Sequence, residues 1–212
     1  MMNLRFINRR IATASLGLFV MAFANPIMAE TELDKAIEAP VLELHSKLIA
    51  IMENADKASF QDRYTILEST IKNRFDTPLI VKVVLSRYWK SLDEHTQTDF
   101  IDMFNRLTIS TYVSRFDSFD GEIFKTLSIE PMKKNRFLVK TEMTSTNDDP
   151  VSFDYIVQKD NEQWKIISVI ADGINDLSLK RAEYSVVIKD KGFNALVADI
   201  EQKIRDLQPG SE

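Results

Sequence analysis

The chain has no cysteine, only five glycines and only two histidines among its 212 residues. The lack of cysteine excludes disulfide bonds, thiolate catalysis and zinc sites built on thiolates. It also excludes anchoring through a lipid-modified cysteine. Five glycines leave little room for a glycine-rich phosphate-binding loop, and no Gly-x-Ser-x-Gly motif is present. Stability must therefore come from a conventional apolar core, for which the chain is long enough.

The N-terminal segment has the three parts of a signal peptide. Arg5, Arg9 and Arg10 precede a run of about 14 apolar or small residues, and a short segment ending at Ala29 follows that run. The apolar run is shorter than the roughly 20 residues that span a bilayer. We therefore expect residues 1–29 to be a signal peptide that is cleaved after Ala29. Residues 30–212 are then expected to form a single soluble domain in the periplasm.

Removal of the predicted signal peptide makes the chain more acidic. Without its three arginines the chain keeps 24 Lys and Arg against 32 Asp and Glu, which is a net charge of −8. Such a charge disfavours binding to the phosphate backbone of nucleic acid and to anionic membrane surfaces. The composition therefore favours a protein that diffuses between membranes and binds no nucleic acid.

Residues 31–117 are predicted to form four helices. Pro40 suits the first turn of the main part of the first helix, where a proline loses no hydrogen bond. Later helix starts are predicted by capping or proline signals at Ser59 with Asp62, at Thr77-Pro78, and at Ser91 with Glu94. The third helix is apolar on almost every side from Leu79 to Trp89, which predicts burial on more than one side.

Residues 121–173 change from a helical period to the two-residue period of strands. The apolar positions of four successive strands are Ile123, Leu127 and Ile129; Phe137, Val139, Thr141 and Met143; Val151, Phe153, Tyr155 and Val157; and Trp164, Ile166, Ser168 and Ile170. Short polar loops join them, which predicts an antiparallel meander with one covered face. With two further helices within residues 175–207, the predicted fold class is α+β. A four-stranded antiparallel sheet packs against the N-terminal helices and is closed by a C-terminal helix pair.

No group of residues predicts catalysis or metal binding. His45 lies beside the apolar stripe of its helix and His95 lies in a polar first turn, and neither has a partner at metal-ligand spacing. The acidic residues within 117–120 and at 148–149 stand among Asn, Ser, Gly and Pro, which is typical of turns. The sequence therefore predicts no catalytic residue, no metal site and no cofactor.

The aromatic residues on the helix and strand surfaces that should meet leave two interpretations open. Such surfaces most often form a packed core. They can also line an apolar cavity for a ligand.

Several segments along the chain form a recognisable pattern. They are Phe75-Asp76, residues 84–90, Phe100, Phe104 and Thr111-Tyr112, then Trp164-Lys165, residues 169–174, 181–184 and 191–196. In this order they resemble the MlaC family of periplasmic phospholipid carriers, also called toluene-tolerance proteins. Residues 172–188 are most similar to the hopanoid-associated branch named HpnM, although Asp-Gly-Ile-Asn stands where the family more often has Glu-Gly-Val-Ser.

The resemblance implies an NTF2-like curved sheet and a carrier that shuttles a phospholipid, or a hopanoid-type lipid, between membrane complexes. Its partners would be an inner-membrane ABC-type lipid transporter with its substrate-binding ring and an outer-membrane lipoprotein complex. Acyl chains would lie in an apolar cavity between sheet and helices, lined by Phe75, Val84, Tyr88, Phe104, Tyr112, Phe153, Tyr155, Val169 and Tyr184. Arg87 or Arg181 would contact the headgroup phosphate, with a surface salt bridge as the alternative for each.

Two functions of other classes stay open. A small NTF2-like enzyme would hold a polar catalytic group inside its sheet. Asp154 argues against this because it alternates with Phe153 and Tyr155 and should therefore point away from the inner face. A ligand-free assembly or scaffold protein would instead have a tightly filled core.

Overall fold

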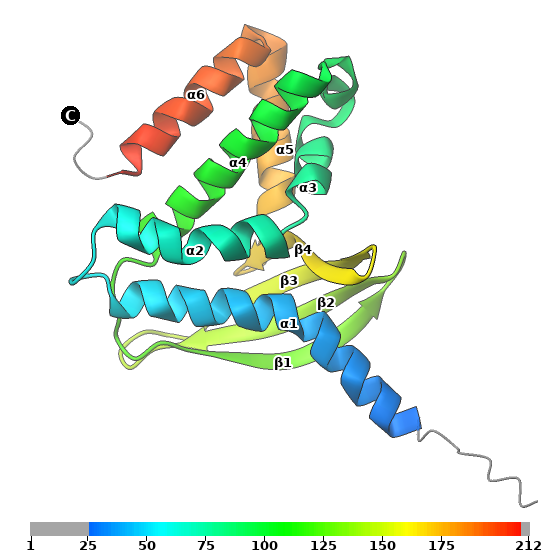
Figure 1. The fold of residues 1–212 in the computed structure, drawn as a ribbon, viewed down its shortest axis with the longest axis vertical. Helices are drawn as coiled ribbons and strands as arrows, with labels where there is room; N and C mark the ends of the chain where they lie inside the picture. Colours follow the sequence, from blue (N-terminus) through cyan, green and yellow to red (C-terminus); the bar gives the residue numbers. More distant parts are fainter. Residues whose placement is uncertain (1–25, 209–212) are drawn as a thin grey trace, which may run out of the picture.

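The computed structural model describes residues 26–208, and the side chains of residues 31–208. The elements follow in the order α1 (Pro26–Glu53), α2 (Phe60–Arg74), α3 (Thr77–Leu85), the 3₁₀ helix η1 (Ser86–Ser91), α4 (Glu94–Arg115), β1 (Ile123–Met132), β2 (Arg136–Thr144), β3 (Val151–Asp160), β4 (Gln163–Ala171), β5 (Ile174–Asn175), α5 (Asp176–Lys191) and α6 (Phe193–Asp206) (Figure 1). The predicted signal peptide lies outside the described residues except for positions 26–29, with which α1 begins.

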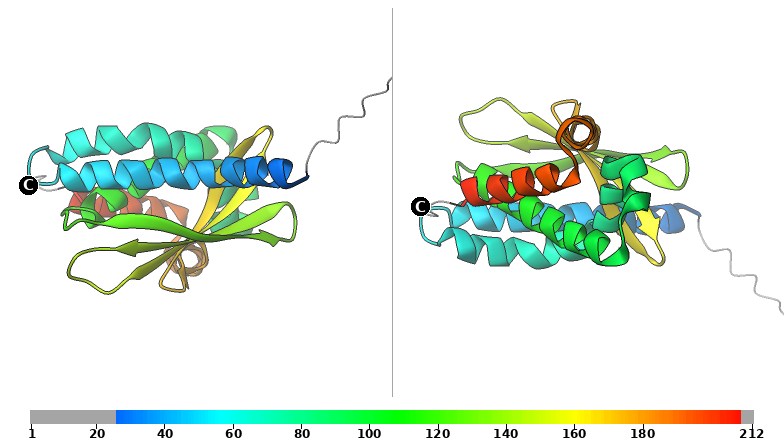
Figure 2. Two further views of the ribbon diagram at one scale, coloured as in Figure 1. Left: turned by 90° about the horizontal axis from the view of Figure 1, so that it is seen from below. Right: turned by 90° about the horizontal axis from the view of Figure 1, so that it is seen from above.

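The first two helices, α1 and α2, lie side by side over one face of the sheet (Figure 2). α2 begins with the predicted capping box, in which the Ser59 hydroxyl accepts from the Asp62 N–H at 3.1 Å and the Asp62 carboxylate accepts from the Ser59 N–H at 3.2 Å. The prediction for Pro40 was wrong, because Pro40 lies inside α1 and not in a first turn. An internal proline removes a helical hydrogen bond, and Figure 1 shows α1 bending along its length.

The third helix begins as predicted but ends early. The Asp76 carboxylate accepts from the Leu79 N–H at 3.0 Å, and Pro78 lies in the first turn. α3 stops at Leu85 because Ser86 takes a φ of 53°, and the chain continues as η1. The next cap also differs from the prediction, since Asp93, and not Ser91, accepts from the Thr96 N–H at 2.9 Å.

The strands form one antiparallel sheet in the order β1-β2-β3-β4-β5. The α+β class and the meander are as predicted, but the sheet has five strands where four were expected. Asp172 and Gly173 have φ values of 47° and 77°, which suits a tight two-residue hairpin turn. The turn lets Ile174 pair with Ala171 and Asn175 with Ile170, and these two residues form β5.

A register shift in β1 corrects the predicted inner face of that strand. The shift lies between Thr126 and Ser128. A bulge adds one residue to a strand and so reverses the alternation of its side chains. Phe124 and Ile129 pack against the core, whereas Ile123 and Leu127 are 64% and 55% exposed.

A second register shift, between β3 and β4, has the same effect on the last long strand. Ile166 pairs with Val157 and Val169 pairs with Tyr155, so both face the helices. The predicted alternation fails after Ile166, because Ser168 and Ile170 pair with outer-face residues of β3. Val169 takes the inner position instead.

The molecule has two parts, which we call the sheet lobe and the helical lobe. The sheet lobe is the sheet with α1 and α2. The helical lobe is α3, η1, α4, α5 and α6, which extend beyond the β4 edge of the sheet (Figure 1). The predicted C-terminal helix pair is α5 and α6. Phe75 and Asp76 join the lobes: Phe75 forms a bridge with Ile166, and the Asp76 N–H donates to the Ile166 carbonyl at 3.0 Å.

Candidate functional site

The inner face of the sheet carries side chains with almost no exposure to solvent. Val139, Thr141, Tyr155, Val157 and Ile166 are each 0–1% exposed. Cross-strand register places Val139 beside Tyr155 and pairs Val157 with Ile166. Three strands therefore present one continuous apolar surface to the helices.

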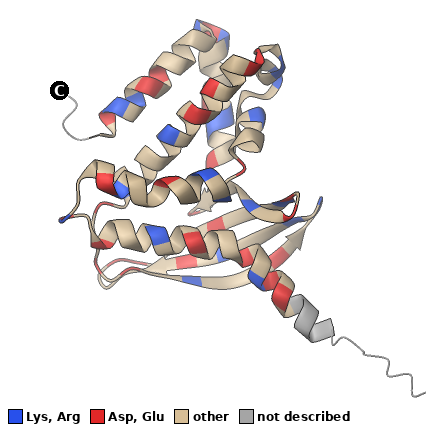
Figure 3. Cartoon of the chain, in the orientation of Figure 1, with Lys and Arg blue, Asp and Glu red and all other residues tan. Residues whose placement is uncertain are grey.

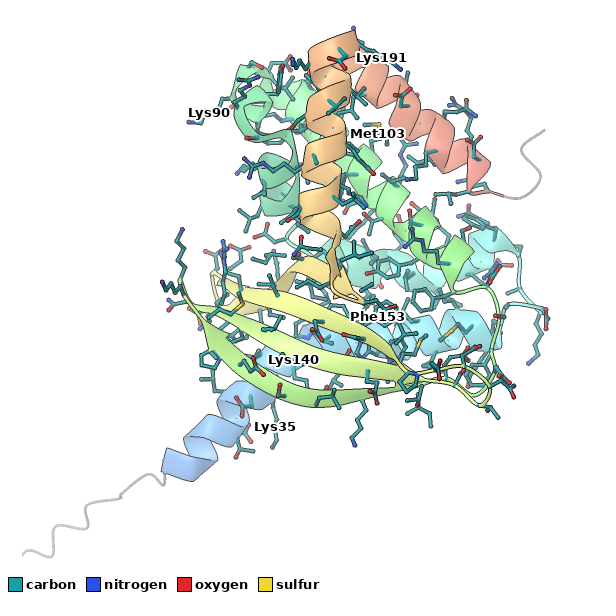
Figure 4. All side chains as sticks on the ribbon, turned by 180° about the vertical axis from the view of Figure 1, so that it is seen from behind. Lys35, Lys90, Met103, Lys140, Phe153 and Lys191 are labelled. Carbon is teal, nitrogen blue, oxygen red and sulfur yellow. The ribbon has the colours of Figure 1, made fainter. Side chains whose placement is uncertain are left out.

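Seven aromatic rings, which we call the aromatic cluster, come from the inner face of the sheet and from the helices that pack against it. Neighbouring ring centroids are 4.0 to 6.4 Å apart, close to the usual range for favourable aromatic contacts. In contact order the members are Phe75, Tyr112, Phe116, Phe153, Phe124, His45 and Tyr155. Figure 4 shows Phe153 where β3 meets the helices. The cluster joins α1, the α2–α3 junction, α4, β1 and β3.

A polar pair is buried inside the aromatic cluster. His45 stacks on Phe124, with centroids 4.0 Å apart and ring planes 12° from parallel, and its Nε2 lies 3.0 Å from the Tyr155 hydroxyl. Burial lowers the pKa of His45 from 6.5 to about 4, and burial raises the pKa of Tyr155 well above its usual 10. Both groups are therefore neutral at pH 7, and their mutual hydrogen bond satisfies them within an apolar layer.

Part of the aromatic cluster reaches the molecular surface. Tyr155 is fully buried, and Phe75 and Phe116 are 6% and 8% exposed. By contrast, Tyr112, Phe124 and Phe153 are only half-buried. The cluster is thus an apolar layer with a closed interior. We call its three half-buried rings, Tyr112, Phe124 and Phe153, the half-buried edge.

The residues predicted to contact acyl chains fall into two groups. Phe75, Tyr112, Phe153 and Tyr155 belong to the aromatic cluster, and Val169 pairs with Tyr155 on the same face. The other four lie in the helical lobe: Val84 in α3, Tyr88 in η1, Phe104 in α4 and Tyr184 in α5.

Three members of the aromatic cluster, His45, Phe116 and Phe124, were absent from the predicted site. His45 was considered only as a metal ligand or catalytic base, although its place beside an apolar stripe is the signal for a buried aromatic role. Phe124 was missed because the β1 alternation was assigned to Ile123 and Leu127. Asp154 lies on the outer face, as predicted, where it pairs in register with Lys140.

The two arginines predicted at the headgroup lie away from the aromatic cluster. Arg87 lines a surface pocket of about 370 Å³ in the helical lobe, and Arg181 donates to the Ser86 hydroxyl on the wall of that pocket at 3.4 Å. We call this the η1–α5 pocket; its lining is Leu85, Ser86, Arg87, Tyr88, Ser185, Val186 and Lys189. The structure therefore brings together two arginines that are far apart in the sequence.

Three other properties of the described part of the chain concern metal sites, the partners of His95 and membrane-spanning helices. Residues 26–208 contain no group of three His, Cys, Asp or Glu side chains placed to hold a metal ion. His95 is exposed, and its Nδ1 lies 3.0 Å from the carboxylate of Asp99 in the same helix. Among the described helices, none is both long and apolar enough to cross a membrane.

Comparison with known proteins agrees with this picture. The family profile described as MlaC protein matches residues 43–202, about three quarters of the chain. This chain belongs to the MlaC family. The region shared with the MlaC family begins two residues before His45 and includes every member of the aromatic cluster.

A solved structure gives the same fold. It is a phospholipid-binding protein from Ralstonia solanacearum, determined in complex with a phospholipid. The two chains are 18% identical with a TM-score of 0.70, and the match covers 81% of this chain and 96% of the other. At this identity the likeness establishes the fold of this MlaC-family chain. No curated protein matches it significantly.

Proposed function

We propose that this protein is a soluble periplasmic carrier that binds a phospholipid and holds its acyl chains against the aromatic cluster. The observation that carries the proposal is the aromatic cluster itself, an apolar layer that reaches the surface in a chain of the MlaC family. The phospholipid bound by the similar Ralstonia protein supports the choice of ligand. Membership of this family also favours a binding carrier over an enzyme.

The physical requirement for such a carrier is an apolar environment for the lipid tails. Each methylene group moved out of water is worth about 0.8 kcal/mol, so a diacyl lipid with roughly 30 of them leaves a membrane very slowly unaided. The aromatic cluster provides an apolar surface made of side-chain rings. Its buried polar pair, His45 with Tyr155, is neutral, and the two side chains hydrogen-bond to each other. A layer without charge accepts acyl chains at no cost of charge burial.

Acyl chains would enter at the half-buried edge of the aromatic cluster. Tyr112, Phe124 and Phe153 come from three different elements, α4, β1 and β3. Small rotations of these rings would open the layer without breaking the sheet. The chains would then lie among the separated rings, next to Val169, which pairs with Tyr155 on the inner face.

The remaining parts of the proposal follow from the family resemblance. They are transfer between an inner-membrane ABC-type transporter and an outer-membrane lipoprotein complex, an NTF2-like curvature of the sheet, and a hopanoid as the alternative lipid of an HpnM-like branch. The signal peptide predicted from the sequence fits this setting, and its cleavage after Ala29 would give a mature protein that begins at Glu30.

Lipid analysis of the natively purified protein tests the proposal. Organic extraction followed by mass spectrometry should recover about one phospholipid per protein. The mass of the intact protein should be that of a chain that begins at Glu30. A periplasmic protein of another fold, purified in parallel, provides the background. Recovery of hopanoid in place of phospholipid would select the HpnM-like branch. Recovery at background level, together with no uptake of fluorescent phospholipid by delipidated protein, would overturn the proposal.

A further inference from the structure

The η1–α5 pocket is built from groups that suit a phosphate. Arg87 and Lys189 stand on its walls with the hydroxyl-bearing residues Ser86 and Ser185, and the Arg181 guanidinium reaches the Ser86 hydroxyl at 3.4 Å. Arg181, Ser185 and Lys189 are four residues apart and form a row along one side of α5. Guanidinium, ammonium and hydroxyl groups are the usual side-chain donors to phosphate oxygens.

The backbone at this pocket has an unusual conformation. Ser86 has a φ of 53° and a ψ of −123°, a region that disfavours residues with a Cβ atom. Such conformations concentrate at functional sites. Here the turn ends α3 and begins the η1 segment whose Arg87 and Tyr88 line the pocket, with the Arg87 guanidinium 5.5 Å from the Tyr88 ring centroid.

The pocket lies within a group of unpaired cations, which we call the cationic patch. Its members are Arg87, Lys90, Arg181, Lys189 and Lys191. None of them forms an ion pair with a carboxylate of residues 31–208. Figure 4 shows Lys90 and Lys191 at the same end of the helical lobe, and Figure 3 shows Lys and Arg gathered along this end of α5 and η1. The exposed acids of α5 are Asp176, Glu183 and Asp190, which follow one another at seven-residue spacing along a different side of the helix.

Exposed apolar side chains accompany the cationic patch. Val186 lines the pocket and is 58% exposed, and Leu179, seven residues earlier on the same side of α5, is 47% exposed. Apolar side chains beside basic ones are typical of surfaces that lie in the headgroup region of a bilayer.

We propose that the cationic patch docks the protein on a membrane rich in anionic phospholipid, with a headgroup phosphate in the η1–α5 pocket. The net charge of −8 predicts repulsion from such a membrane as a whole. Charges further away than about 8–10 Å are largely screened at physiological salt, so the local patch decides the orientation and the contact. Docking is therefore weak and reversible, and it presents the helical lobe to the bilayer.

Sedimentation with vesicles tests this proposal. Full-length mature protein should bind vesicles of phosphatidylglycerol and phosphatidylcholine, and should bind pure phosphatidylcholine at least tenfold more weakly. Each cation near an anionic surface contributes roughly fivefold to binding. The double variant Arg87→Glu and Lys189→Glu should therefore lose at least tenfold in affinity, and 0.5 M salt should weaken the wild type similarly.

The matched control is Lys125→Glu with Lys133→Glu. It makes the same change in net charge at exposed positions on and just after β1, and it should bind the mixed vesicles nearly as well as the wild type. Equal loss in both variants, or equal binding of the wild type to both kinds of vesicle, would overturn the proposal. Binding of inorganic phosphate without vesicle binding would show a site for free phosphate and would also overturn it. Lipid extracted from the pocket variants should be unchanged, so failure here is distinct from failure of the carrier function.

Discussion

The aromatic cluster and the η1–α5 pocket are opposite kinds of candidate binding site in one chain. The aromatic cluster lies mainly in the sheet lobe, with Tyr112 and Phe116 added from the C-terminal end of α4, and it is neutral at pH 7 and closed except for its half-buried edge. The pocket lies in the helical lobe, is open to solvent and has Arg87 and Lys189 on its walls. α3 separates them, and its nine residues span about 13 Å. The two proposals therefore assign lipid tails and membrane headgroups to different parts of the molecule.

The largest expected effect is a loss of stability at low pH, and it tests the claim that the aromatic cluster is neutral. Burial lowers the pKa of His45 to about 4, whereas an unfolded chain protonates its histidine near 6.5. The unfolded state therefore binds more protons between pH 4 and 6.5, so the stability that neutral His45 contributes is complete above about pH 6.5 and is lost as the pH falls toward 4. The loss should reach about 3 kcal/mol.

The measurement is the free energy of urea unfolding at pH 7 and pH 4 for the wild type and for His45→Gln. Carboxylates titrate in both proteins, so the difference between them isolates His45. The exposed residue His95 offers a control, and His95→Gln should keep the wild-type dependence. A His45→Gln variant that loses as much stability as the wild type would show that His45 accepts a proton within the folded layer.

The next effect concerns whether the binding site for acyl chains extends to α3 and Val84. Val84 was predicted to line the cavity, but its side chain has no exposed surface in α3, which is packed on several sides. Val84→Trp should overpack this region and lower the free energy of unfolding by about 1–3 kcal/mol. Lipid recovered per folded protein should be normal. Unchanged stability of the delipidated variant, combined with lost lipid, would place acyl chains next to α3. It would then be wrong to assign the acyl chains to the aromatic cluster alone.

The same substitution on the sheet should act on binding. Val169 is half-buried on the inner face beside Tyr155, so Val169→Trp should fill space meant for acyl chains. Lipid uptake by delipidated protein should fall about tenfold, which corresponds to about 1.4 kcal/mol. Ile170→Trp is the control, because Ile170 pairs with Asp154 on the outer face and should keep its uptake. Similar uptake by the two variants would argue against acyl chains at the inner face.

The smallest effect concerns the junction of the lobes. Asp76 caps α3 through its contact with the Leu79 N–H, so Asp76→Ala should lower the free energy of unfolding by about 1 kcal/mol. Asp76→Asn keeps a capping oxygen and should retain most of the stability. Neither change should alter lipid recovered per folded protein. A loss of lipid in Asp76→Ala alone would show that the orientation of α3 also affects lipid binding by the aromatic cluster.

Local signals in the sequence predict much of this fold. The Ser59–Asp62 capping box and the Thr77-Pro78 start are correct because both act within one helical turn. The predictions failed where non-local contacts decide. Pro40 is tolerated inside α1 because it is buried between Ile37 and Val41, which are both 0% exposed, so tertiary packing holds the helix at this point. The fifth strand needed two positive φ values at Asp172 and Gly173, which the Asp-Gly pair only hints at.

The candidate site was harder to predict than the fold. A single bulge in β1 exchanges Ile123 for Phe124 on the inner face, and no periodicity in one strand reveals a bulge that depends on its partner strand. The resemblance to the MlaC family named four members of the aromatic cluster but not His45, whose buried partner Tyr155 is 110 residues away. The convergence of Arg87 and Arg181 likewise appears only when α5 packs beside η1.

Nuclear Overhauser contacts between a bound lipid and the protein test the central claim most directly. Delipidated protein would be loaded with phosphatidylglycerol carrying ¹³C only in its acyl chains, and isotope-filtered spectra would be recorded. The account predicts contacts from acyl methylenes to the ring protons of Phe124, Phe153 and Tyr112. Bound lipid whose methylenes contact only the residues around Val84 and Tyr184, and none of these three rings, would contradict it.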